Sequence, residues 1–524
     1  MKLGQIIQKL RTDANLSQEK FAALFPVSQQ SVQKWESGEA TPDLDKIVKI
    51  SKQFGISLDA LILGNDPRVV EEMKSANQLK PQYATLNEWE FYPAILPTEY
   101  RQSTEEGLDI EQYKDLFADV ARLPNNEVKK QFGDILFDIV ANAPQKQGYP
   151  YIEPSSLEGI RELRKPYTYP KTKGASLESR IAGAWSGRIS GCMLGKTVEG
   201  IRTNEFHPFL KETGNFPMHR YIYSTDLTEE ILNKYQFPFA SRPCADRIDG
   251  MPVDDDTNYT VLYQEVIEKY GKDFTPYDVS RAWLYYQNKD AYCTAERIAF
   301  CNFVKGFVPP ASAAYQNPFR EWIGAQIRAD YFGYINPGNP ELAAEMAWRD
   351  ASVSHIKNGI YGEMFVAAML AVAAETNNIQ DILLGGLAQI PETSRLYEKV
   401  YALLQDYLSG VSQEECFRKI HQEYDEHSPH DWCHTISNAL IVTASLLYGN
   451  GDFGKSICMS VEAGFDTDCN GATVGSILGM ANGMESIPEY WTQPFRGTVH
   501  TSIFGIGSPK LSDLIQKTLS HIGE

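Results

Sequence analysis

The chain has 524 residues, of which 43% are hydrophobic and 11% aromatic, so it is a globular protein long enough for roughly two to four domains. Its formal net charge of −19 excludes a nucleic-acid-binding surface over the whole chain, but leaves room for one small DNA-binding module. The eight cysteines form no C-x-x-C pair and the nine histidines show no zinc-ligand spacing, which predicts reduced thiols in a cytoplasmic protein. The chain starts in a polar amphipathic helix, and no apolar run reaches the about 20 residues of a membrane helix. We therefore expect neither a signal peptide nor a membrane partner.

Residues 1–65 are predicted to form a domain of five short helices. Apolar residues recur at helical spacing, and capping residues separate the helices: Ser17, Ser28 and Asp43 as N-caps and Gly38 as a left-handed C-cap. Two such helices joined by a short turn make the helix-turn-helix arrangement.

The sequence of this domain resembles the Cro/phage-repressor (XRE) family in L-R-x-x-x-N-L-S-Q-E-x-F-A, V-S-Q-Q-S-V-x-K-W-E-S-G and T-P-D-L. In that family the third helix enters the major groove. The resemblance therefore implies that Gln29, Gln30, Ser31 and Lys34 contact double-stranded DNA, where glutamine can form two hydrogen bonds with adenine. The domain carries only modest positive charge, so we expect weak binding by one copy and a homodimer that reads two half-sites. The alternative is a helical bundle that serves protein interaction or dimerisation.

Residues 66–174 are predicted to be a linker followed by accessory helices. Up to residue 108 the segment mixes prolines, charges and aromatic residues without a sustained period, and the aromatic residues favour packing on a neighbouring domain. Amphipathic helices are expected over Ile110–Val120, Glu127–Ala143 and Ser156–Leu163. We interpret them as scaffold helices that cover the following domain; a dimerisation arm is the alternative.

Residues 175–524 are predicted to form an all-α domain larger than a four-helix bundle, because helical stripes follow one another and convincing alternating strands are absent. The expected helices are Leu177–Leu194, Thr257–Tyr270, Ser280–Tyr286, Asn317–Ala329, Glu341–Ser354, Gly362–Thr376, Ser394–Leu408, Gln413–His421, Thr435–Leu447, Phe453–Ala463 and Gly471–Gly483.

Two of these helices carry glycine at every fourth position, from Gly183 to Gly195 and from Gly471 to Gly483. Glycine inside a helix costs about 0.5–1 kcal/mol relative to alanine, so each stripe predicts the close approach of another backbone. The first stripe runs into an acid, Glu199, and the second follows a pair of aspartates.

Carboxylates gather at the heads of two predicted helices, in Asp254–Thr257 and in the pair Asp466 and Asp468. N-capping and compensation of the helix dipole need one aspartate or two, so packing does not explain a run of three. Two such clusters are the composition that a site for two Mg²⁺ ions needs, because Mg²⁺ binds carboxylate oxygens. We expect both clusters to meet Glu199 at one site.

The three motifs together resemble the ADP-ribosylglycohydrolase family, which includes the dinitrogenase-reductase-activating glycohydrolases. The family pattern is G-x-x-x-G-D-x-L-G-x-x-x-E, then D-D-T, then G-x-D-T-D-[TS]-x-x-x-x-x-G-x-x-x-G, and the resemblance spans about Leu177–Gly483. It implies a compact all-α fold with two Mg²⁺ ions in a cleft. It also implies hydrolysis of the N- or O-glycosidic bond that links ADP-ribose to a protein side chain or a small acceptor.

By position, the resemblance also implies the roles of individual residues. The implied metal ligands are Asp255, Asp256, Thr257, Asp466 and Asp468, and the implied catalytic residues are Glu199, Asp256 and Asp466.

A further segment resembles the family's substrate-contacting T-H…G-Y-x-G motif. It places His355, Tyr361 and Gly362 against the substrate, with His355 on ribose or phosphate. The alternative for His355 is a capped histidine on the surface.

Three residues depart from the family pattern. Cys192 stands where the first motif has aspartate, and Cys469 stands where the last motif has threonine or serine. Sulfur is a poor ligand for a hard ion, so the resemblance leaves Cys469 a doubtful ligand and Mn²⁺ an alternative ion. Asp254 stands where the family has serine or threonine and offers a compensating oxygen.

The leading functional hypothesis is a Mg²⁺-dependent hydrolase of ADP-ribosylated protein or of a small ribosylated metabolite, fused to a DNA-binding module. One alternative is a transcriptional regulator that senses an ADP-ribose-like or nucleoside ligand without turnover. The other is a nucleosidase on the same fold.

Overall fold

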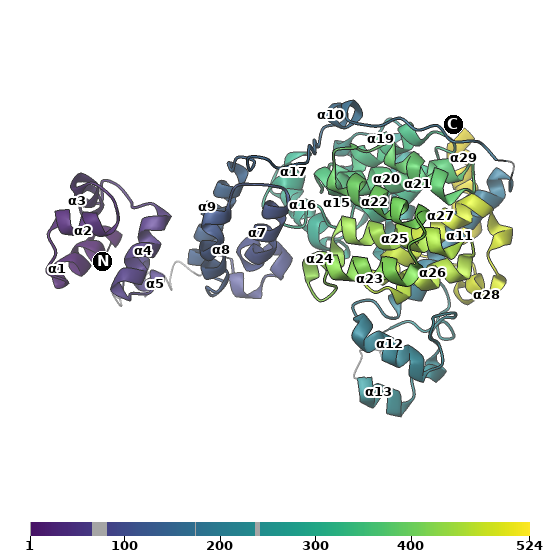
Figure 1. Ribbon diagram of the computed structural model, residues 1–524, viewed down its shortest axis with the longest axis horizontal. Helices are drawn as coiled ribbons and strands as arrows, with labels where there is room; N and C mark the ends of the chain where they lie inside the picture. Colours follow the sequence, from purple (N-terminus) through teal and green to yellow (C-terminus); the bar gives the residue numbers. More distant parts are fainter. Residues whose placement is uncertain (1, 65–80, 173, 236–241, 524) are drawn as a thin grey trace. The chain divides into compact units, whose positions relative to one another are not determined.

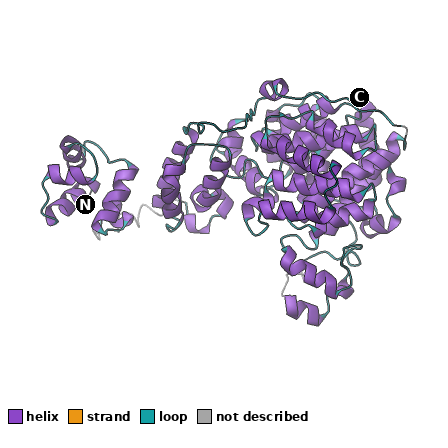
Figure 2. Cartoon of the chain, viewed as in Figure 1, coloured by secondary structure: helices purple, strands orange, loops and turns teal. Residues whose placement is uncertain are grey.

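The computed structural model describes residues 2–64, 81–172, 174–235 and 242–523, so residues 66–80 of the predicted linker lie outside the described residues. Throughout these ranges the chain forms helices and loops with isolated β-bridges but no strand (Figures 1 and 2). The predicted all-α fold class is therefore confirmed. The chain divides into two compact units, residues 1–87 with 122–135 and residues 88–121 with 136–524.

The five predicted N-terminal helices are all present. They are α1 (Leu3–Asp13), α2 (Gln18–Leu24), α3 (Gln29–Ser37), α4 (Leu44–Phe54) and α5 (Leu58–Leu63). Ser17, Ser28 and Asp43 each accept a hydrogen bond from the backbone N–H three residues further on, and Gly38 has φ 79°, so the predicted caps are confirmed.

An ion pair ties these short helices together over a small apolar core. Arg11 Nε lies 2.5 Å from Glu36 Oε1, and Gln18 Nε2 donates to Glu36 Oε2 at 2.7 Å. Because Arg11 is on α1, Gln18 on α2 and Glu36 on α3, one carboxylate fixes the positions of three helices.

The remaining helices continue to the end of the chain, and those from residue 157 on surround a large core that contains the glycine-striped pair (Figure 1). The longer ones, in chain order, are α7 (Leu96–Glu105), α8 (Lys114–Ala121), α9 (Glu127–Ala141), α10 (Leu157–Glu162), α11 (Leu177–Lys196), α12 (Thr203–Glu212), α13 (Glu229–Tyr235), α14 (Asp255–Tyr270), α15 (Pro276–Tyr286), α16 (Thr294–Val304), α18 (Asp330–Tyr334), α19 (Pro340–Ala351), α20 (Lys357–Ala373), α21 (Ile379–Leu387), α22 (Arg395–Leu408), α23 (Gln413–Glu423), α24 (Pro429–Cys433), α25 (Thr435–Gly449), α26 (Phe453–Glu462), α27 (Thr467–Asn482) and α29 (Leu511–Gly523).

The glycine stripes of α11 and α27 face each other in antiparallel register. A Cβ atom on Gly187 would collide with the carbonyl of Gly475, and one on Gly191 would collide with the carbonyl of Gly471. The two backbones are therefore in direct contact, as the stripes predict, and only hydrogen atoms fit between them.

The predicted helix Asn317–Ala329 is wrong, because this segment forms turns and a short 3₁₀-helix at Gln326–Arg328. Pro318 disfavours helical backbone at the residue before it. The Asn317 side chain also bonds the backbone, accepting from Phe319 N–H and donating to the carbonyl of Ser354. The bond with Phe319 is local and competes with a helix, and the bond to Ser354 ties the segment to a distant part of the backbone.

The start of the second striped helix also differs from the prediction. α27 begins at Thr467, four positions before Gly471, and Asp466 is its N-cap residue. Asp468 and Cys469 consequently lie in the first helical turn, beside the end of α11.

Two helices that the sequence did not predict, α12 and α13, are inserted between Glu199 and the aspartate run. The first is held to the core by Glu426, whose carboxylate accepts hydrogen bonds from the backbone N–H of Thr203 at 3.0 and 3.2 Å. This contact caps a helix that has no capping side chain of its own.

We predict that Gly475→Ala lowers the free energy of unfolding by about 3 kcal/mol or more, because the added methyl group must push two helix backbones apart. Urea unfolding followed by circular dichroism measures this. Gly523→Ala on α29 is the control, since a Cβ atom there has open space. Equal stability of the two variants would contradict the packing described here.

Candidate metal centre

The contact between α11 and α27 brings the first and third acid motifs together. Gly195, near the end of α11, lies so close to α27 that a Cβ atom would collide with the peptide joining Thr467 to Asp468. Thr467 Oγ1 donates to the Gly195 carbonyl at 3.0 Å. As a result Glu199, four residues further along the chain, has its carboxyl group beside that of Asp468.

A buried arginine on α11 positions the second acid motif. Arg188 is 0% exposed, and its guanidinium donates to Asp256 Oδ1 at 3.0 Å, to the Asp256 carbonyl at 3.0 Å and to Asp330 Oδ2 at 2.8 Å. These bonds hold the N-terminus of α14 against α11. The three acid motifs therefore meet at one site, as the sequence analysis expects.

Carboxylates at this site lie close to one another; Asp254, Asp256, Asp466 and Asp468 are buried, and Glu199 and Asp255 are half-buried. Burial and the neighbouring Glu199 raise the pKa of Asp466 to about 7. Burial and adjacent acids also raise the pKa of Asp255, Asp256 and Asp468 above the ordinary range of aspartate. Such shifts mean that the negative charge of the acids together is not fully compensated, although Arg188 pairs with Asp256, and a bound cation would supply the missing positive charge.

Two carboxylate oxygens at the site are buried without a hydrogen-bond partner among the described residues, Asp256 Oδ2 and Asp468 Oδ1. Ligand atoms of Asp256, Asp468 and Cys469 all lie within 4.8 Å of one another. Leaving buried polar atoms unsatisfied is costly, so these oxygens fit a role as metal ligands. The side chains present are therefore suited to a divalent cation.

Asp254 is in a different position, because both of its carboxylate oxygens already have partners. Oδ1 accepts from the Asp256 N–H at 2.9 Å and from the Cys192 S–H at 3.2 Å, and Oδ2 is paired with the ammonium group of Lys196. Thr257 Oγ1 donates to the Asp254 carbonyl at 3.3 Å. Metal ligation by Thr257 and Asp254 stays a prediction.

The predicted substrate-contacting residues lie in the interior of the domain. His355 is 0% exposed, which makes the alternative of a surface histidine wrong, and its Nδ1 atom lies 2.9 Å from Ser354 Oγ. Tyr361 donates its hydroxyl to the Pro154 carbonyl at 2.5 Å, and Gly362 packs against Thr435. Contact of these residues with substrate therefore stays a prediction.

Other residues near the acids were not found from the sequence, because they lie between the motifs. Cys433 Sγ lies 3.8 Å from Asp466 Oδ2, and Arg242 Nη1 lies 3.6 Å from Glu199 Oε2. The Arg202 guanidinium lies 4.9 Å from the ring centroid of Trp432, the residue before Cys433.

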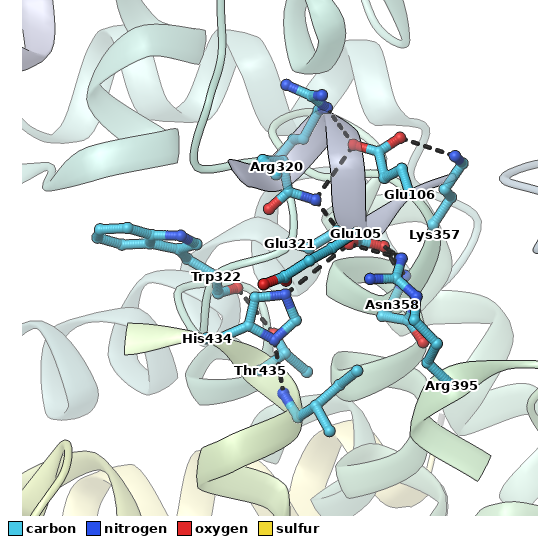
Figure 3. Close-up of polar contacts among 12 residues, drawn as sticks. Glu105, Glu106, Arg320, Glu321, Trp322, Lys357, Asn358, Arg395, His434 and Thr435 are labelled. Atoms are coloured by element: carbon cyan, nitrogen blue, oxygen red, sulfur yellow. Dashed lines mark hydrogen bonds and ion pairs between the residues drawn. The ribbon is translucent and has the colours of Figure 1, made fainter. Parts of the chain in front are cut away.

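A second buried charge network attaches α7 to the domain (Figure 3). Glu106 accepts from Arg320 Nε at 2.6 Å and from Lys357 Nζ at 2.7 Å, and Arg395 Nη2 lies 2.8 Å from Glu321. Glu106 of this network lies in the segment predicted as a linker, and the scaffold role of the accessory helices stays a prediction.

Beside this network, Glu105, His430 and His434 have the composition of a metal site. Their hydrogen bonds argue against that role. Nδ1 of His430 accepts from the Trp322 indole N–H at 3.2 Å, and Nδ1 of His434 accepts from the Ile436 N–H at 3.1 Å. A ring nitrogen that accepts a hydrogen bond carries no proton, so each ring has a proton on Nε2, and Nε2 of His430 lies 3.0 Å from Glu105 Oε2. A metal-bound histidine instead donates its second N–H.

The predicted DNA-contacting residues lie on one helix of the N-terminal domain. Gln29, Gln30 and Lys34 of α3 are exposed and Ser31 is half-buried, whereas Trp35 is turned into the core. An exposed polar face on this helix is what groove insertion requires.

A family model described as ADP-ribosylglycohydrolase matches residues 173–519, about two thirds of the chain. The chain belongs to the ADP-ribosylglycohydrolase family. Its family domain makes it a glycosidase-like enzyme. A helix-turn-helix model matches residues 7–61, so the chain also carries a DNA-binding module. Both resemblances drawn from the sequence are thus confirmed.

Among curated proteins, the chain is 35% identical over 83 residues to the HTH-type transcriptional activator BcrR of Enterococcus faecalis, a match that covers 16% of this chain and 41% of that protein. It is 36% identical over 61 residues to YonR, an SPbeta prophage-derived uncharacterized HTH-type transcriptional regulator of Bacillus subtilis (strain 168), covering 12% of this chain and 56% of that protein. The matches thus span about half the length of these relatives.

Among solved structures, a chain of an ADP-ribosylglycohydrolase-related protein complex aligns with a TM-score of 0.40 and 17% identity, covering 66% of this chain and 98% of that one. Within the described ranges, no helix combines the length and the apolar composition that crossing a bilayer demands.

We predict that divalent cations stabilise the protein and that the variant Asp466→Asn/Asp468→Asn loses this response. The metal-free variant should unfold at a higher temperature than the metal-free wild type, because two buried carboxylates no longer repel their neighbours. Differential scanning calorimetry with and without chelator measures both effects. An unfolding temperature of the wild type that divalent cations leave unchanged would contradict the presence of a metal centre.

Proposed function

We propose that the chain is a divalent-cation-dependent hydrolase of an N- or O-glycosidic bond to ribose, fused to a DNA-binding module. Its substrates in this proposal are ADP-ribosylated proteins or a small ribosylated metabolite, and its cation is Mg²⁺ or Mn²⁺. The observation that carries the proposal is the convergence of three acid motifs, with two unpartnered buried oxygens, in a family member.

The chemistry of ribosyl transfer suits this arrangement. Cleavage of a glycosidic bond passes through a state with positive charge at the anomeric carbon, which nearby carboxylates stabilise. A divalent cation, when bound, supplies a Lewis acid that orients hydroxyl groups and activates water. Three motifs that meet at one place can therefore both hold the sugar and promote its hydrolysis.

Glu199 is the residue we assign as general base. Burial raises its pKa above the ordinary value of glutamate, which makes the carboxylate a stronger base near neutral pH. Asp256 and Asp466 are the other acids at the reacting centre. Arg188 fixes the orientation of Asp256, and Asp466 faces Cys433.

We predict that Glu199→Gln lowers kcat for ADP-ribose release by about 10²–10⁴-fold, since the amide cannot accept the proton of water. Release from ADP-ribosylated peptides is followed by chromatography in the presence of Mg²⁺ or Mn²⁺. Glu205→Gln is the matched control, because Glu205 is exposed on α12.

The same assay separates the alternatives. Cleavage of free nucleosides without cleavage of ADP-ribosylated peptides would replace the proposal by a nucleosidase. Binding of ADP-ribose by calorimetry without any turnover would replace it by a ligand sensor, a role that fusion to a DNA-binding module favours.

For the N-terminal domain we propose that α3 enters the major groove of double-stranded DNA as part of a homodimer.

Lys34→Ala is predicted to weaken binding to all DNA sequences. It should also lower the slope of the logarithm of the binding constant against the logarithm of the salt concentration by about one, because one phosphate contact is lost. Gln30→Ala is predicted to relax base preference by about 1–3 kcal/mol. Selection from random duplexes, followed by gel shifts, tests both; Lys49→Ala on α4 is the control. Unchanged binding in both α3 variants would contradict the proposal.

A further inference from the structure

The metal centre contains two overlapping groups of candidate ligands, which differ in how far their atoms are already used. The first group is Cys192, Asp254 and Asp256, and the second is Asp256, Asp468 and Cys469. Their hydrogen bonds determine which group is open to a cation, and the ligand atoms of the open group determine which kind of cation it suits.

The first group is closed by a lysine. The Lys196 ammonium group lies on Asp254 Oδ2, while Asp254 Oδ1 accepts from the Cys192 thiol and the Asp256 N–H. Asp254 is 4% exposed and caps α14. Both of its carboxylate oxygens therefore already accept hydrogen bonds from protein groups, and the Lys196 ammonium group already balances its negative charge.

The second group is open. Asp256 Oδ2 and Asp468 Oδ1 have no hydrogen-bond partner in the part of the chain that the structure describes, and the residues are 0% and 2% exposed. The third candidate ligand is the sulfur of Cys469, a residue that is 6% exposed. The pocket thus offers two unused carboxylate oxygens and one thiol.

A thiol in the ligand set determines which ion is preferred. Mg²⁺ takes oxygen ligands in near-octahedral geometry and keeps several waters. Thiolate sulfur favours softer divalent ions, whereas mixed sulfur and carboxylate sets are found around zinc and related first-row metals.

We propose that the centre binds one first-row transition-metal ion through Asp256, Asp468 and the Cys469 thiolate, and that the Lys196 ammonium group takes the place of a second cation. Binding breaks the S–H bond of Cys469, forms a metal–sulfur bond and releases the proton to solvent. The inference rests on the metal centre of the proposed function and goes beyond it in the class and number of ions.

Cobalt titration of the metal-free full-length protein tests the inference. Co²⁺ bound to thiolate shows a charge-transfer band in the near ultraviolet, and we expect the band to saturate at one equivalent. Cys469→Ser should lose the band and weaken Co²⁺ binding by at least about tenfold, the loss typical of removing even an outer-shell partner. The serine hydroxyl should shift the ion preference toward Mg²⁺.

Two further variants make the result specific. Cys433→Ser is the matched control, because this buried thiol lies 3.8 Å from Asp466 but outside both ligand groups, and it should keep the band. Lys196→Met should raise the metal content from one ion per chain to two, measured by mass spectrometry of the dialysed protein. Circular dichroism confirms that each variant is folded.

The inference would be overturned if Co²⁺ saturates the wild-type protein without a charge-transfer band, or if each wild-type chain binds two ions. The proposed function would survive that result if Mg²⁺ supports ADP-ribose release. Conversely, a cysteine-dependent band at one equivalent in a protein that cleaves no ribosyl substrate would support the inference and overturn the proposed function.

Discussion

The direct contact between the backbones of α11 and α27 is the constraint on which the rest of the structure depends. It requires glycine on both helices at matching positions, and any side chain there would separate them. Because the helices run antiparallel, the contact places the end of α11 beside the start of α27. Glu199, Asp468 and Cys469 are neighbours for that reason, although more than two hundred and fifty residues separate them in the chain.

The charge balance of the site follows from this packing. Arg188 is buried on α11, where it compensates Asp256 and Asp330, and Lys196 compensates Asp254 at the end of the same helix. The acids at the start of α27 have no comparable partner, and their pKa values are raised. One helix thus supplies both the cations that close part of the site and the geometry that leaves the remainder open for a metal ion.

Local signals in the sequence predict much of this. The N-caps of the first domain and the glycine stripes each leave a short, regular pattern, and the caps and the contact between the stripes are as expected, although α27 begins four residues earlier than predicted. Segments stabilised by distant partners could not be predicted in this way. Asn317–Ala329 has helical apolar spacing, but bonds from its polar side chains to remote backbone prevent a helix. The pairing of Lys196 with Asp254 likewise leaves no trace at sequence level, because a lysine at a helix end is commonplace.

Crystals of the full-length protein soaked in Mn²⁺ test the central claim, that the three acid motifs form a metal centre, most directly. The account predicts an anomalous difference peak between Asp256 and Asp468, next to Cys469 and on the side away from Lys196. A soaked crystal with full diffraction and no peak at these residues, or with Mn²⁺ bound only elsewhere on the surface, would contradict it.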